Sequence, residues 1–96
     1  MKFEFDLAKS KANAVKHAID FQSAQKLWTD EQRLVVELVG LTEPRWLLVA
    51  RLGGKLWTAV FTRRGENIRI ISVRRSREGE KENYEDQEKD DNGSGV

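Results

Sequence analysis

Four arginines near one end of the predicted sheet have the chemistry of a phosphate-binding group. They come level with one another if residues 45–52, 55–62 and 68–75 form neighbouring antiparallel strands, and they are Arg51, Arg74, Arg75 and Arg77. Guanidinium groups match phosphate oxygens with paired hydrogen bonds, and phosphate contacts position a protein on a nucleic acid. Ion pairing with the acidic side chains of residues 78–82 is the alternative, and the sequence leaves both interpretations open.

A second arginine pair, Arg63 and Arg64, lies at the opposite end of the same predicted hairpin. A strand of about 9 residues, at 3.3 Å per residue, separates this pair from Arg74 and Arg75 by roughly 30 Å. The two arginine groups are therefore not expected to form one cluster.

His17 is the only histidine in the chain, and histidine is the residue type that usually titrates closest to neutral pH. It is a candidate general acid or base, or it is a helix C-cap or a buried, hydrogen-bonded ring. Lys16 beside it adds a cation that suits a phosphate-facing role. Tyr84 also has two interpretations, stacking on a nucleobase or pinning the last helix to the sheet. The tryptophans are expected in the core, and they are Trp28, Trp46 and Trp57.

Composition excludes several classes of protein. The chain has 96 residues, of which 39% are hydrophobic and 34% charged, and this length suits one domain. The absence of cysteine excludes a disulfide framework and a cysteine-based zinc site, and with one histidine we expect neither a metal nor another cofactor. No apolar run approaches the roughly 18 residues of a membrane span, and no signal-peptide core is evident, so we expect a cytoplasmic protein. There is no GxGxxG, P-loop, HExxH or GxSxG motif, so the sequence gives no support for nucleotide hydrolysis, zinc proteolysis or serine hydrolysis.

Charge is divided unevenly along the chain. Residues 1–75 carry 14 Lys and Arg against 8 Asp and Glu, a net of +6, whereas residues 76–96 carry 3 against 8, a net of −5. The sum is the formal +1 of the whole chain. A basic body suits a polyanionic partner, and the alternative is that these charges form ordinary solvated faces.

Two helices are predicted first. Asp6 precedes residues 7–18 and Asp20 precedes residues 21–28, and each carboxylate can accept hydrogen bonds from the free amides of a first helical turn. An apolar stripe on the first helix is expected to face the core, and it comprises Ala8, Ala12, Val15 and Ile19. A basic polar edge is expected to face outward, and it comprises Lys9, Asn13 and Lys16.

Four antiparallel strands are predicted to follow as a meander, over residues 33–39, 45–52, 55–62 and 68–75. Gly53 and Gly54 suit the positive φ angles of a two-residue hairpin turn. Residues 3–5 could add a short edge strand. Strict alternation in the last strand would place one set of side chains on a single face, namely Ile68, Ile70, Ser72 and Arg74.

A last helix is predicted to begin after Ser76, which can cap it, and to end near Glu85. Residues 87–96 are expected to form a disordered acidic tail. The order of the elements predicts one α+β domain over residues 1–86, with two N-terminal helices, a four-stranded antiparallel sheet and a C-terminal helix.

Two blocks of the sequence resemble the BrnT family of ribonuclease toxins, which have a RelE-like fold. The blocks are FDLAKSKANAVKHAIDF and RWLLVARLGGKLWTAVFTRRGENIRIISVRRSREGEKENYE, and together they run from Phe5 to about Glu85. The polar positions that match the family pattern are Lys16, His17, Arg64, Ser72, Arg74, Arg75, Glu82 and Tyr84. Ala18 departs from the pattern, since the family usually has glycine after the Lys-His pair, and Gly79 interrupts the last helix.

The resemblance implies the toxin of a type II toxin–antitoxin system, a metal-independent endoribonuclease that inhibits translation and growth. It also implies a BrnA-like antitoxin as the neutralising partner, with operator DNA bound only through the toxin–antitoxin complex. The match assigns the chemistry to no single residue. Because histidine is the residue type that usually titrates closest to neutral pH, we expect His17 to act as base or acid, with Glu82 as its substitute.

We expect Arg74 and Arg75 to stabilise the negative charge that develops on the phosphate, because arginines carry a permanent positive charge. Substrate contacts are expected from Lys16, Arg51, Arg64, Ser72, Arg77 and Tyr84. The competing hypothesis is a non-catalytic module that binds RNA or an acidic protein through its basic sheet.

Overall fold

The computed structural model describes residues 2–40 and 42–93 of the chain. In chain order its elements are β1 (Phe3–Glu4), α1 (Leu7–His17), α2 (Phe21–Ala24), the 3₁₀-helix η1 (Gln25–Thr29), β2 (Leu34–Leu38), β3 (Arg45–Leu52), β4 (Lys55–Arg64), β5 (Asn67–Arg75) and α3 (Glu78–Gly93). Three α-helices and one mixed sheet make an α+β fold, which confirms the predicted class.

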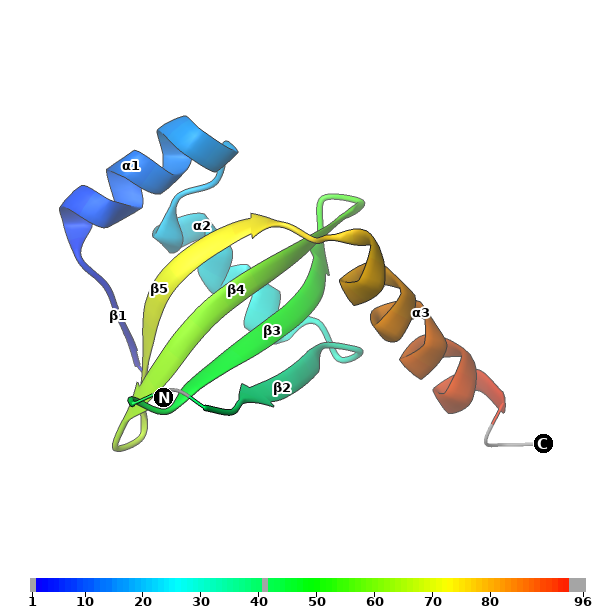
Figure 1. Ribbon diagram of the computed structural model, residues 1–96. Coiled ribbons are helices and arrows are strands. Elements are labelled where there is room, and N and C mark those ends of the chain that lie inside the picture. The colour runs from blue at the N-terminus through cyan, green and yellow to red at the C-terminus, as the bar shows by residue number, and fades with distance from the viewer. Residues whose placement is uncertain (1, 41, 94–96) are drawn as a thin grey trace.

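The strands form one sheet in the order β1-β5-β4-β3-β2 (Figure 1). Strands β2 to β5 are antiparallel neighbours, which confirms the predicted meander. Strand β1 runs parallel to β5, with Phe3 opposite Ile68, so the short edge strand considered for residues 3–5 is present. The sheet is therefore five-stranded and mixed, and the expectation of a purely antiparallel four-stranded sheet is wrong. Two residues are too few to show the period-two pattern that identifies a strand in a sequence.

Short-range signals place the ends of the first two helices and the tight turn. The Asp6 carboxylate accepts a hydrogen bond from the Lys9 backbone N–H at 3.0 Å, and that of Asp20 accepts one from the Ser23 backbone N–H at 2.7 Å. Gly53 and Gly54 have φ angles of 61° and 75°, which confirms the predicted hairpin turn.

Ser76 does not cap α3 as predicted. It is buried, and its hydroxyl shares a hydrogen bond of 2.8 Å with the Thr58 hydroxyl. The Glu80 carboxylate instead accepts a hydrogen bond from the Arg77 backbone N–H at 2.8 Å, as the third residue of a helix does in a capping box.

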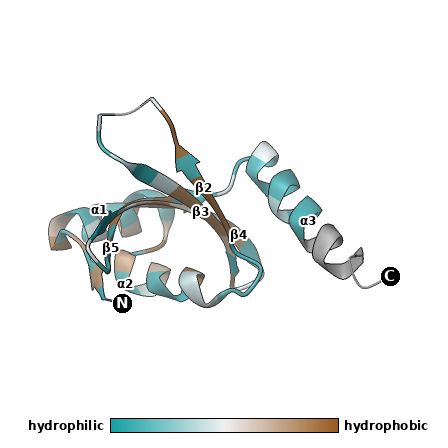
Figure 2. Ribbon diagram, turned by 90° about the horizontal axis from the view of Figure 1, so that it is seen from below, coloured by the Kyte–Doolittle hydropathy of each residue, from teal (hydrophilic) through white to brown (hydrophobic). Residues whose placement is uncertain are grey.

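Helices α1, α2 and η1 cover one face of the sheet, and α3 projects from the other side near the start of β2 (Figures 1 and 2). Hydrophobic colouring follows the central strands β3 and β4 in Figure 2. The buried members of the main core are Ile19, Phe21, Ala24, Leu27, Leu48, Ala50, Trp57, Ala59, Phe61, Ile68, Ile70 and Val73. Trp57 is buried as predicted, and Trp28 and Trp46 are half-buried at the margin of this core.

Helix α1 faces the sheet with the side opposite to the predicted one. Its buried residues are Ser10 and Asn13, whereas Val15 is 89% exposed and Ala8 and Ala12 are exposed. The predicted apolar stripe is therefore wrong within the helix, although Ile19 just beyond it is buried as predicted. Of the predicted outward edge, Lys9 and Lys16 are exposed and Asn13 is not. The buried polar side chains satisfy backbone groups: the Ser10 hydroxyl accepts a hydrogen bond from the Phe21 N–H at 2.9 Å.

A register shift breaks the predicted alternation in β5. Strands β4 and β5 pair as Val60 with Ser72 and then as Phe61 with Ile70, so Ile71 is an extra residue. Ile70 and Val73 consequently share the core face, and Ser72 and Arg74 lie on the other face from Ile70. The expectation that Ile70, Ser72 and Arg74 share a face is wrong.

Helix α3 is held to the sheet by Tyr84. Its ring is 1% exposed in a small second cluster with Val49 and Leu56, and its hydroxyl donates to the Asp30 carboxylate at 2.8 Å. The helix continues to Gly93, through most of the segment for which the sequence predicts disorder, and residues 94–96 lie outside the described residues. Across the described parts of the chain, no helix is long and apolar enough to cross a membrane.

Candidate functional site

An open pocket of about 470 Å³ lies where the end of α1 meets the start of β4 and the end of β5. Its lining residues are Lys16, His17, Ala18, Lys55, Trp57, Arg74 and Arg75. Trp57 pairs with Arg75 across the two strands, and α1 is attached to β5 through Asn13. The fold thus brings the single imidazole together with two lysines and two arginines that are far apart in the sequence.

The end of α1 determines where His17 lies. Ala18 adopts a left-handed conformation with φ 63° and ψ 26°, and its N–H donates to the Ala14 carbonyl at 3.0 Å, which ends the helix. An L-residue with a Cβ pays roughly 1–2 kcal/mol in this conformation. The Asn13 side chain donates to the Ile19 carbonyl at 2.8 Å and so holds the turn just after the strained residue.

The Arg75 side chain lies over the aromatic ring of Trp57. Its guanidinium carbon lies 5.4 Å from the centroid of the Trp57 ring, within the range of a cation–π contact. The indole N–H of Trp57 donates to the Leu52 carbonyl at 3.2 Å, which orients the ring. The Arg75 side chain remains exposed, so its charge is available at the pocket.

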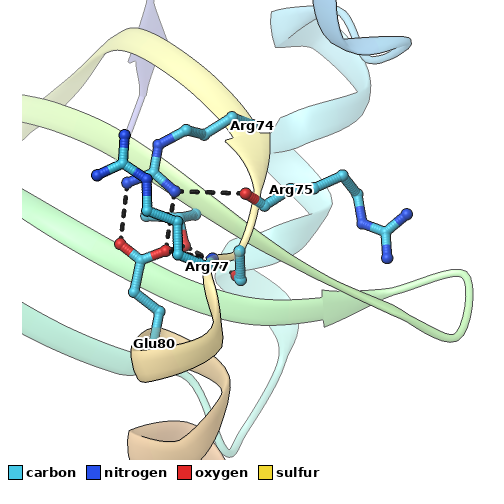
Figure 3. Close-up of polar contacts among 6 residues, drawn as sticks. Arg74, Arg75, Arg77 and Glu80 are labelled. Atoms are coloured by element: carbon cyan, nitrogen blue, oxygen red, sulfur yellow. Dashed lines mark hydrogen bonds and ion pairs between the residues drawn. The ribbon is translucent and has the colours of Figure 1, made fainter.

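Arg74 has a different environment, because neighbouring residues of a strand point to opposite faces. Its guanidinium forms a two-pronged contact with Glu80, at 2.8 and 2.9 Å, and Figure 3 shows the Arg75 side chain pointing away from this pair. Glu80 also accepts from the Thr58 hydroxyl at 2.9 Å. The hydrogen bond from Arg74, which outweighs burial, and further donors lower the pKa of Glu80 from 4.5 to about 2.

A model of the family described as "Ribonuclease toxin, BrnT, of type II toxin-antitoxin system" matches residues 5–80 of the chain. The chain belongs to the BrnT family. The matched range includes every residue that lines the pocket, and it ends at Glu80. A comparison with curated proteins finds no match. BrnT membership places the chain among ribonuclease toxins of type II systems, and it implies an antitoxin protein as partner.

Other residues predicted for the BrnT site lie away from the pocket. Arg51 lies over the ring of Tyr84, with its guanidinium carbon 5.6 Å from the centroid. Tyr84 is buried and pins α3, which favours the structural interpretation, because a nucleobase needs an exposed ring on which to stack. Of the four predicted arginines, Arg75 thus lies over Trp57, whereas Arg51, Arg74 and Arg77 contact residues of α3.

The remaining predicted positions are also dispersed. Arg64 lies at the far end of the β4–β5 hairpin, opposite Asn67, as the strand length predicts. Ser72 lies opposite Val60, Arg77 is exposed at the start of α3, and Glu82 is exposed on α3. None of these four lines the pocket that contains His17.

Three residues were not predicted for the site: Lys55 and Trp57, which line the pocket, and Glu80, which binds the pocket residue Arg74. Lys55 follows the glycine turn and opens β4, level with the end of β5, so the strand register alone could have indicated it. Trp57 was predicted to lie in the core, and it does. Its ring also makes a cation–π contact with the guanidinium of Arg75. Glu80 was considered only as one of several possible ion-pair partners, whereas it binds Arg74, Thr58 and Arg77 together.

A second pocket of about 400 Å³ lies at the other end of the sheet, where Trp28 and Phe61 lie beside Arg33 and Arg63. It contains no histidine, whereas the pocket at the end of α1 contains His17. Within the described residues, no group of three or more acidic or histidine side chains could hold a metal ion.

The Glu80 contacts predict an acid-sensitive contribution to stability. Because the pKa of Glu80 is lower in the folded protein than its ordinary value of 4.5, its stabilisation is complete above about pH 4.5 and is lost as the pH falls toward 2. We expect Glu80→Gln to lower the free energy of unfolding by about 2 kcal/mol at pH 7 and by far less near pH 2. Chemical denaturation across this pH range measures the difference.

The matched control is Glu85→Gln, which removes a carboxylate from an exposed position of the same helix. Glu85→Gln should change the unfolding free energy little at any pH. An equal loss in the two variants, or a loss for Glu80→Gln that persists at pH 2, would show that the Arg74–Glu80 contact does not stabilise the fold in this way.

Proposed function

We propose that this BrnT-family chain is a metal-independent endoribonuclease whose active site is the pocket at His17. The observation that carries the proposal is the convergence of the imidazole with Lys16, Lys55 and Arg75 in one open pocket. An imidazole can transfer protons near neutral pH, and the three cations can bind a phosphodiester. Family membership supplies RNA as the substrate class.

The proposed reaction uses the RNA's own 2′-hydroxyl as nucleophile. His17 takes the proton from the 2′-oxygen, which forms a bond to the adjacent phosphorus as the bond from phosphorus to the 5′-oxygen breaks. The imidazolium then supplies a proton to the departing 5′-oxygen. The products are a 2′,3′-cyclic phosphate and a 5′-hydroxyl, and no atom from a metal-bound water is required.

Electrostatic stabilisation is assigned chiefly to Arg75. The phosphate gains negative charge in the transition state, and cations already directed at it lower the barrier most effectively. Arg75 shares the Trp57 face of the sheet with the end of α1, whereas the guanidinium of Arg74 is engaged by Glu80. We therefore assign Arg75 to the substrate phosphate, and Arg74 to positioning the junction between β5 and α3.

Cleavage of a short mixed-sequence RNA by the purified chain, in the presence of EDTA, tests the proposal. We expect products that end in a 2′,3′-cyclic phosphate, identified by mass spectrometry. The matched substrate carries a single 2′-deoxyribose at the cleaved position, and that linkage should remain intact because it lacks the nucleophile. RNA that is bound but never shortened by the folded protein would contradict the proposal and favour a non-catalytic binding module.

A further inference from the structure

The two buried side chains of helix α1, those of Ser10 and Asn13, are polar and bind backbone groups of the body. The Asn13 side chain donates to the carbonyls of Ile19 and Val73, at 2.8 and 2.9 Å, and accepts from the Val73 N–H at 3.2 Å. Ser10 accepts from the Phe21 N–H. None of the residues of α1 belongs to the buried part of the main core. The large apolar side chains of the helix, Leu7 and Val15, are therefore not buried in this core.

These exposed apolar side chains form one outward face. Leu7 is 64% exposed and Val15 is 89% exposed, and Ala8 and Ala12 between them are also exposed. Their spacing of three to four residues, and of eight from end to end, places them on one side of the helix. We call this surface the outer face of α1. An exposed apolar stripe on an ordered helix is typical of an interaction surface.

Charge on the helix restricts what can cover the outer face. The helix carries Lys9, Lys11 and Lys16 and no acidic residue. Lys11 falls within the apolar stripe, one turn after Leu7 and one turn before Val15. A complementary surface must therefore offer apolar side chains at its centre and carboxylates beside them.

Other occupants fit this chemistry less well. RNA would meet the lysines but would leave the aliphatic side chains of Leu7 and Val15 without favourable contacts. Two copies of the outer face would place lysines against lysines, because a symmetric interface uses the same patch on both subunits. A membrane surface requires a larger apolar face than two large side chains provide.

The outer face and the pocket share the C-terminal end of α1. Lys16 and His17 line the pocket, whereas Val15, in the same last turn, does not, because successive side chains of a helix diverge by about 100°. A partner that covers Val15 and extends past the end of the helix would hinder the approach of RNA.

We propose that the outer face of α1 is the docking surface for an acidic, apolar segment of the antitoxin. Leu7 and Val15 are its apolar anchors and Lys11 its charge contact. The docking itself does not depend on the proposed function. The expectation that docking hinders RNA binding rests on the proposed function. The arrangement accounts for an apolar stripe that the fold leaves in solvent, and it couples antitoxin binding to the site through one helix.

Isothermal titration of the full chain with the purified protein encoded beside it measures the docking without RNA. We expect Val15→Glu to weaken binding about 10- to 100-fold, because the change removes an apolar anchor and places a carboxylate against an acidic partner. The matched control is Val39→Glu, at a valine that is 88% exposed just after β2. Val39→Glu should bind within about twofold of the parent chain.

A charge test is independent of the apolar anchor. Lys11→Glu should weaken binding most at low salt, whereas Lys26→Glu, at an exposed lysine on η1, should not. Melting temperatures of all four variants establish that each one is folded.

Unchanged binding by Val15→Glu, or an equal loss for Val15→Glu and Val39→Glu, would overturn the proposal. So would sedimentation of the chain alone showing self-association that Val15→Glu abolishes, since the occupant would then be a second copy. An inactive nuclease that still binds the antitoxin through Val15 would refute the proposed function and leave the docking surface intact.

Discussion

Replacing His17 with alanine is expected to lower kcat/KM for RNA cleavage by about 100- to 10,000-fold, the usual contribution of a general acid–base group. The reason is structural as well as chemical: His17 is the only imidazole of the chain, and it lies in the pocket with Lys16, Lys55 and Arg75. Initial rates with a fluorescent RNA substrate measure the effect.

His17→Gln serves as a second variant, because it keeps a polar side chain at the half-buried end of α1. The matched control is Lys26→Ala, which removes a charge from an exposed position outside the pocket. Cleavage by a folded His17→Ala protein within a few-fold of the parent rate would remove His17 from the chemistry. The exposed Glu82, which does not line the pocket, would not be an obvious replacement.

Features that depend on neighbouring residues could be predicted from the sequence. The aspartate caps of α1 and α2, the glycine turn and the strands from β2 to β5 are encoded within a few residues each, and the structure contains them. The strand register also placed Arg64 correctly at the far end of the sheet from Arg74. Strand β1 is close to the limit of what a sequence can predict, since the pairing of a two-residue strand depends almost wholly on the neighbouring strand.

The orientation of α1 could not be predicted from its amphipathic pattern. The pattern assumes that apolar side chains face inward, but the Val73 backbone N–H and carbonyl needed partners and Asn13 supplied them. Such a long-range requirement is invisible in a helical wheel. The bulge at Ile71 likewise changed which side chains of β5 face the core, because one extra residue exchanges the faces of all the residues beyond it.

The sequence indicated individual residues of the candidate site but not that they lie together. Family resemblance and residue type singled out Lys16, His17 and Arg75 separately, and only the packing of α1 on β5 places them together. Arg74 and Arg75 look equivalent as neighbours in the sequence, yet one meets Glu80 and the other lies over Trp57. Strand alternation implies that such a pair divides between two faces, and this signal was available in the sequence.

Replacing Asn13 with alanine is expected to lower the free energy of unfolding by about 3 kcal/mol, because several buried polar groups would lose their partner. Within residues 2–40 and 42–93, β1 pairs with β5 only at Ile68 and Arg69, and no other strand continues that edge of β5. Asn13 takes the place of such a strand for Val73, by donating to its carbonyl and accepting from its N–H, and it also binds the Ile19 carbonyl. A melting temperature lower by roughly 15 °C is the expected readout for a domain of this size.

The matched control for this change is Asn83→Ala, which removes an exposed asparagine from α3 and should alter the melting temperature little. A loss below about 1 kcal/mol for Asn13→Ala would mean that water replaces the amide at Val73. Because Asn13 also holds the turn after Ala18, its removal should displace His17 as well as destabilise the fold. At a temperature where both proteins remain folded, we therefore expect Asn13→Ala to lower kcat more than KM rises, whereas a purely structural role would leave both unchanged.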